Sequence, residues 1–85
     1  MAVKNNLQFV KDNYPDVLIA DGFDDAIIGL SYDPLAGAYR VCYSIERCHE
    51  CLVKDGEMSL DEAIEFFEYN VIGSYMGPET PIFVI

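Results

Sequence analysis

The residues of this sequence best suited to chemistry are three cysteines and the only histidine, which lie between positions 42 and 51. They are Cys42, Cys48, His49 and Cys51. A C-x-x-C pair with a neighbouring histidine is typical of zinc and thiol–disulfide sites. The spacing argues against a shared metal, because on an intact helix His49 and Cys51 lie about 200° apart. Cys48 instead falls on a stripe that runs from Ile45 to Leu52, which predicts a small buried side chain.

The same geometry argues against catalysis by these residues. A redox-active pair places its first cysteine at a helix N-terminus, where the dipole lowers the thiol pKa, but Cys48 would lie a full turn inside its helix. A Cys–His nucleophile needs both side chains within hydrogen-bond reach, whereas sequence neighbours on a helix point apart. We therefore predict no catalytic residue, no metal ligand and no cofactor. The roles of Cys48, His49 and Cys51 stay open.

A group of acidic residues could also form a calcium site. Asp21, Asp24 and Asp25 surround a Gly-Phe pair, which could suggest calcium binding. A calcium-binding loop of the EF-hand type needs acids at alternating positions, a glycine at the sixth and a glutamate at the twelfth. This segment lacks that spacing, so it predicts a turn.

The clearest surface pattern lies toward the end of the sequence. From position 57 onward six acidic side chains occur without a single lysine or arginine. Asp61, Glu65 and Glu68 are four and three residues apart, so they would stack on one helix face. Phe66 and Tyr69 flank that face, and aromatic side chains beside acids are typical anchors of protein interfaces. Two interpretations stay open: a solvated face that aids solubility, or a docking surface for a protein partner with a basic surface.

Periodicity and turn residues predict the elements that position these side chains. In the N-terminal half the spacing of apolar residues indicates a weak helix over 3–14, which Pro15 ends. Residues 17–20 are apolar and partly β-branched, which predicts either a short strand or a buried segment. Two further runs, 26–32 and 38–43, are separated by a Pro/Gly turn and predict a β-hairpin.

The C-terminal half predicts two helices and a strand. Ser44 is a favourable N-cap for the first helix, and Gly56 suits the left-handed position behind it. An S-x-x-E capping box at 59–62 opens the second helix, which Gly73 ends. The apolar run 82–85 predicts a last strand, which we expect inside the sheet because an exposed edge this apolar invites pairing. A stripe expected to face the core comprises Leu60, Ala63, Ile64, Phe67 and Val71.

These elements predict an α+β fold in a single domain, residues 1–85. We expect a small antiparallel sheet, made of the hairpin and the C-terminal strand, packed against an αα-hairpin and an N-terminal helix. A chain of this length is one domain, and 52% hydrophobic and 13% aromatic residues are incompatible with intrinsic disorder.

Charge and hydropathy exclude several classes of function. A net charge of −10 is opposite to the basic footprint of a nucleic-acid binder, so we expect no direct nucleic-acid contact. It also argues against docking on an anionic membrane. No apolar run reaches the roughly 18 residues of a membrane span. Three cysteines without a secretory signal pattern predict reduced thiols and an intracellular protein.

Two stretches carry a family resemblance. One is A-D-G-F-D-D-A-I-I-G at 20–29, and the other comprises 43–48, 55–63, 65–75 and 80–84, which close on T-P-I-F-V. Together they resemble a family of small acidic proteins encoded by tailed bacteriophages and prophages. The resemblance implies a phage accessory protein in the bacterial host cytoplasm, with no established activity and no catalytic residue to transfer. The first 19 residues lie outside it.

Our leading hypothesis is a non-enzymatic accessory protein that binds a host or phage protein through its acidic face. In its sharper form, the face formed by Asp61, Glu65 and Glu68 occupies the nucleic-acid site of a defence or replication enzyme and inhibits it. The first alternative is a self-assembling, homo-oligomeric module, because so apolar a short chain could expose apolar surface. The second is a small metal or redox protein.

Overall fold

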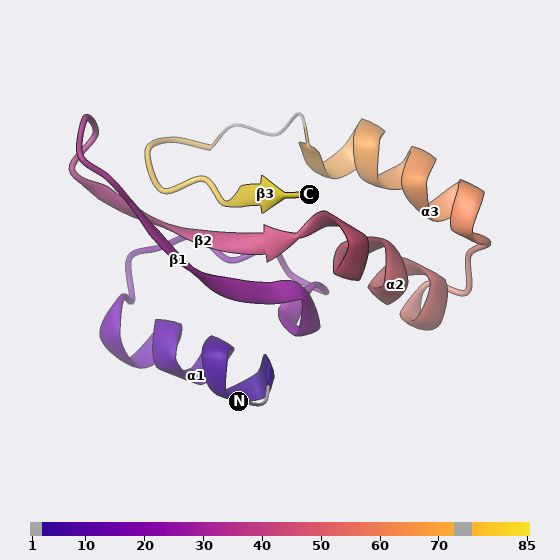
Figure 1. The fold of residues 1–85 in the computed structure, drawn as a ribbon, viewed down its shortest axis with the longest axis horizontal. Helices are drawn as coiled ribbons and strands as arrows, with labels where there is room; N and C mark the ends of the chain where they lie inside the picture. Colours follow the sequence, from indigo (N-terminus) through magenta and orange to yellow (C-terminus); the bar gives the residue numbers. More distant parts are fainter. Residues whose placement is uncertain (1–2, 73–75) are drawn as a thin grey trace.

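The structure, a computed structural model, describes residues 3–72 and 76–85, with side-chain placements from residue 7 onward (Figure 1). The chain folds into helices and a small sheet, which confirms the predicted α+β class. The predicted helix end at Gly73 lies outside the described residues. The elements are α1 (Val3–Asn13), a 3-10 turn η1 (Asp24–Ala26), β1 (Ile27–Asp33), β2 (Ala38–Ser44), α2 (Ile45–Asp55), α3 (Leu60–Phe67), a π-helical turn η2 (Glu68–Ile72) and β3 (Ile82–Val84).

In the described residues the sheet has three strands in the order β1-β2-β3. The hairpin is antiparallel as predicted, with Tyr32 opposite Tyr39. The prediction of a wholly antiparallel sheet is wrong, because β3 pairs with β2 in parallel, Ile82 opposite Cys42. The cause is the connection: α2 leads away from the end of β2 and α3 returns alongside it, so the chain re-enters the sheet in the direction of β2 (Figure 1).

The expectation that the last strand lies inside the sheet is also wrong. β1 already occupies one side of β2, so β3 takes the other side and forms an edge. The edge is only three residues long. Short edge strands are one way in which proteins limit unwanted pairing with other chains.

Both predicted helix caps between β2 and α3 are present. The Ser44 hydroxyl accepts a hydrogen bond from the Arg47 N–H at 3.2 Å. At the start of α3, the Glu62 N–H donates to the Ser59 hydroxyl at 3.2 Å, and the Ser59 N–H donates to the Glu62 carboxylate at 2.9 Å. This reciprocal pair satisfies two backbone donors that the first turn of a helix leaves unpaired. Within the described ranges, no helix is long and apolar enough to cross a membrane.

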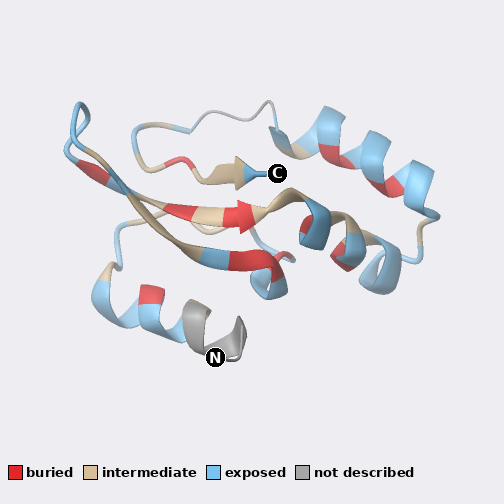
Figure 2. Ribbon diagram, in the orientation of Figure 1, coloured by how far each residue is buried: buried red, intermediate tan, exposed pale blue. Residues whose placement is uncertain are grey.

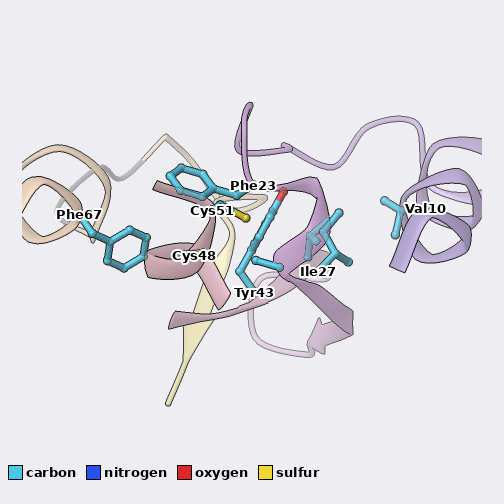
Figure 3. Close-up of a cluster of buried hydrophobic side chains, with 9 residues drawn as sticks. Val10, Phe23, Ile27, Tyr43, Cys48, Cys51 and Phe67 are labelled. Carbon is cyan, nitrogen blue, oxygen red and sulfur yellow. The ribbon is translucent and has the colours of Figure 1, made fainter. Parts of the chain in front are cut away.

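The core lies on one side of the sheet and is shared by every layer (Figures 2 and 3). Val41 and Tyr43 point from β2 into it, and Val10 reaches it from α1. Phe67 of α3 closes the opposite end, with its ring edge-on to Phe23 at 5.9 Å. The core therefore extends from α1 to α3 across the strands, and all the described helices lie against the same side.

Tyr43 is fully buried, yet its hydroxyl has a partner. The Ala20 N–H donates to the Tyr43 Oη at 2.8 Å. Residues 17–20 are half-buried and carry no regular structure, so the strand prediction for them is wrong and the alternative of a buried segment holds only in part. This segment passes behind the strands in Figure 1, where Tyr43 holds it against the sheet.

The left-handed residue after α2 differs from the prediction. Gly56 has φ −91° and closes the helix through its N–H to Leu52, whereas Glu57 takes φ +55°. Glycine is needed at 56 for another reason: a Cβ there would lie 2.8 Å from the Leu52 carbonyl oxygen.

The apolar stripe of α3 faces the core only at its centre. Ala63 and Phe67 are buried and Val71 is half-buried, as predicted. Leu60 is 58% exposed and Ile64 is also exposed, so for these two the prediction is wrong. α3 packs on α2 at the margin of a small core, which leaves no neighbour to cover the full width of the stripe.

A Tyr43→Phe variant tests the hydrogen bond to Ala20. We expect the free energy of unfolding to fall by about 1–2 kcal/mol at pH 7, because the Ala20 N–H loses its acceptor. Burial raises the Tyr43 pKa from 10.0 to about 12, so the contribution of its neutral form is complete below pH 10 and is lost as the pH rises toward 12. Urea denaturation across this range should show a smaller loss in the variant. Equal stability and equal pH dependence would contradict the assignment.

The turn after α2 predicts stability changes of opposite sign for two substitutions. Gly56→Ala should destabilise the chain by about 1–3 kcal/mol, because the new methyl meets the Leu52 carbonyl. Glu57→Gly should stabilise it by up to about 1 kcal/mol, because glycine adopts positive φ without the strain of a side chain. Thermal denaturation of both variants measures the two signs, and a stabilising Gly56→Ala would refute the close approach.

Candidate protein-binding surface

The acidic and aromatic residues of α3 and η2 border an open groove of about 500 Å³ on the surface. Its position follows from the helix: Ala63 and Phe67 are buried, so the residues on the other side of α3 face outward. The capping box fixes where the helix begins, and Met58, just before the N-cap Ser59, contributes to the groove. We call this the α3 groove; it is lined by Met58, Glu62, Glu65, Phe66, Tyr69 and Asn70.

The structure brings together three of the five site residues predicted from the sequence. Glu65, Phe66 and Tyr69 line the α3 groove. Phe66 is 40% exposed and Tyr69 is 82% exposed, although both carry large aromatic rings. Asp61 and Glu68 are exposed too, but they do not line the groove. Glu68 begins the π-helical turn and keeps helical backbone angles, φ −64° and ψ −40°.

Three groove residues, Met58, Glu62 and Asn70, were not among the predicted site residues, and all three lie at or beyond the ends of the helix. Asn70 donates from its side-chain amide to the Phe66 carbonyl at 3.0 Å, which ties η2 to the last turn of α3. Met58 lies before the cap and is half-buried. The spacing of the capping box could have predicted the position of Met58. No sequence pattern predicted the π-helical turn.

The groove carries negative charge from Glu62 and Glu65, and none of the described residues that line it is basic. Hydrogen bonds from Ser59, backbone first and side chain second, lower the pKa of Glu62, so this carboxylate stays charged at lower pH than usual. An acidic groove beside two exposed aromatic rings can accept a cationic side chain and pack against its aliphatic stem.

Of the three cysteines, Cys48 and Cys51 belong to the core. Cys48 and Cys51 are buried, which confirms the predicted packing role of Cys48, and Cys42 is half-buried. Burial raises the pKa of all three thiols, for Cys48 to about 12. His49 packs against Phe67, with ring centroids 5.3 Å apart. In the part of the chain that the structure describes, no three His, Cys, Asp or Glu side chains gather as metal ligands would.

A second exposed aromatic cluster was missed by the sequence analysis. Tyr39 of β2 contacts Tyr14 at 4.7 Å and its cross-strand neighbour Tyr32 at 4.9 Å between ring centroids. Phe9 extends the row at 6.1 Å from Tyr14. The available signal was the symmetric placement of Tyr32 and Tyr39 about the hairpin turn. These contacts attach the end of α1 to the hairpin.

Thiol labelling tests the placement of the cysteines. In the folded protein at pH 8 we expect a maleimide to modify Cys42 first, with Cys48 at least about tenfold slower, because its thiol is buried and its pKa is raised to about 12. A Cys42→Ser variant should lose the fast-reacting thiol, and denaturant should expose the other two. Rapid labelling of Cys48 in the native state would contradict the structure.

Comparison with protein-family models, curated proteins and solved structures found no match to this chain. The function must therefore be argued from the chain's own surfaces. Of these, the α3 groove combines charge of one sign with exposed aromatic side chains, and the buried cysteines offer neither.

Proposed function

We propose that this chain is a non-enzymatic binding protein whose α3 groove docks on the basic surface of a partner protein. The observation that carries the proposal is the exposure of Phe66 and Tyr69 beside Glu62 and Glu65 in one groove. Aromatic side chains are the commonest anchors of protein interfaces, and truncating such an anchor typically costs 2 kcal/mol or more in binding.

Charge selects the kind of partner. The chain carries a net charge of −10, and its last third has acids and no bases. Such a field attracts a basic partner over distances of about 8 Å in physiological salt and raises the rate of encounter. Arginine fits this groove best, because it can pair with a carboxylate and stack on an aromatic ring.

The biological setting that we propose is a phage accessory protein acting in the cytoplasm of a bacterial host. Its support is the sequence resemblance in residues 20–85 together with the charge pattern. The sharper form of the proposal is inhibition: the acidic face takes the place of nucleic acid on a defence or replication enzyme. Basic surfaces that bind phosphates would recognise carboxylates on a rigid helix by the same electrostatics.

A comparison of baits tests the proposal. Tagged wild type, Glu65→Lys, Tyr69→Ala and the matched control Glu50→Lys are used to capture proteins from bacterial lysate, followed by quantitative mass spectrometry. Glu50 is an exposed residue of α2 that lies outside the α3 groove. We expect one protein to be retained by the wild type and the control and reduced about tenfold or more by each groove variant, with retention lost at high salt.

Purified partner and calorimetry then give the affinities directly. Equal retention of the same proteins by the groove variants and the wild type would sink the proposal, because the groove would contribute nothing. Circular dichroism of each bait checks that the substitutions leave the fold intact. Reduction of binding by Glu50→Lys alone would place the interface on α2 and equally refute the groove.

A further inference from the structure

The α3 groove runs along a single helix and its two ends, because every residue that lines it falls within positions 58–70. Side chains four positions apart on a helix lie in one row. Two such rows border the groove: Glu62, Phe66 and Asn70 form one, and Glu65 and Tyr69 form the other. Rows of this kind are the ridges of a helix surface, and the space between two ridges is where a second helix packs.

This side of α3 points away from the rest of the described chain. Ala63 and Phe67 turn the opposite side of the helix toward the core. In Figure 1 α3 lies at the margin of the molecule beside α2, and Figure 2 shows most of its length exposed. The two ridges are therefore open to an element of another molecule.

The backbone of α3 limits what that element can be. An extended peptide binds proteins chiefly through main-chain hydrogen bonds to a sheet edge. A helix spends its backbone donors and acceptors on its own hydrogen bonds, so the side of α3 offers an extended chain little to pair with. The side chain of Asn70 is likewise engaged, since it donates to the Phe66 carbonyl at 3.0 Å. A partner helix satisfies its own backbone and needs only the side chains that the groove presents.

The charges of the groove specify the face of such a helix. Glu62 stands on one ridge and Glu65 on the other. The Glu62 carboxylate is held in place because it accepts a hydrogen bond from the Ser59 N–H at 2.9 Å. Met58 and the aromatic rings add apolar surface between and beside the acids. A complementary face therefore combines basic and apolar side chains.

We propose that the partner enters the α3 groove with a basic amphipathic α-helix. This inference rests on the proposed function and adds to it the element that the groove receives. The helix is about three turns long, because Glu62 and Asn70 are about 12 Å apart along α3 at 1.5 Å per residue. Its contact face carries arginines three or four positions apart, one for each carboxylate, beside apolar residues that meet the aromatic rings.

Two labelled peptides test the proposal by fluorescence anisotropy on the whole chain. One is an alanine-based helix of about 18 residues with arginine and leucine on one face. The other has two central alanines replaced by proline, which keeps the charge and breaks the helix. We expect the helical peptide to bind with a dissociation constant of about 100 μM or lower at low salt, and the proline peptide to bind at least about tenfold more weakly.

Variants of the chain locate the binding. Glu65→Lys and Tyr69→Ala should each weaken the helical peptide about tenfold, because one removes a carboxylate and the other an aromatic anchor. Glu50→Lys is the matched control on α2 and should leave the affinity within about twofold, a change of about 0.4 kcal/mol. Circular dichroism of each variant separates loss of binding from loss of the fold.

The outcomes distinguish this inference from the proposed function. Equal affinity of the two peptides overturns the helical partner, but the groove remains a site for basic partners if Glu65→Lys weakens both. A helical peptide that fails to bind up to about 1 mM also overturns the inference. So does one that binds the groove variants as tightly as the wild type. In these two cases capture from lysate with the same variants tests the proposed function by itself.

Discussion

The hydrogen bond from Ala20 to Tyr43 joins the two halves of this fold. Tyr43 lies on the central strand, and its ring contacts Phe83 of β3 at 5.6 Å between centroids. Its hydroxyl satisfies a backbone donor in a segment that has no ladder or helix of its own to do so. The segment carries α1 at one end and the turn before β1 at the other. The buried side chain of Tyr43 therefore connects the irregular segment, and through it α1, to the same strand that β3 packs against.

Local signals in the sequence were sufficient for most of the architecture. Ser44, and Ser59 with Glu62, marked helix starts because a cap depends on residues only three positions apart. The hairpin followed from two apolar runs and a Pro/Gly turn. The direction of β3 did not follow from its sequence, because a short apolar strand such as I-F-V can pair in parallel or antiparallel. Its orientation is set by the path of the chain through α2 and α3. The conformation of Gly56 was missed for a related reason: the constraint is a contact with Leu52, not a turn type.

The candidate surface, too, could be predicted only where it depends on residues close in the sequence. Glu65, Phe66 and Tyr69 could be selected from spacing on one helix, and they meet in the α3 groove. Asp61 and Glu68 could not be excluded, because spacing on one helix does not show which of its exposed residues border the groove. The neighbours within the sheet could not be predicted either, since Gly29, Cys42 and Ile82 are brought together only by strand pairing between distant parts of the chain.

The parallel pairing of β2 with β3 has a consequence for the order in which the chain folds. Cys42 and Ile82 are partners in the ladder although forty positions separate them, and two helices lie between. The hairpin and the capped helices need only local contacts, so they can form first, whereas closing the long loop costs entropy that β3 repays with three residues of ladder. We expect β3 to dock last, and substitutions in it to speed unfolding more than they slow folding. Until it docks, the ring of Tyr43 lacks its neighbour Phe83, and the side of β2 that β3 covers is open to water.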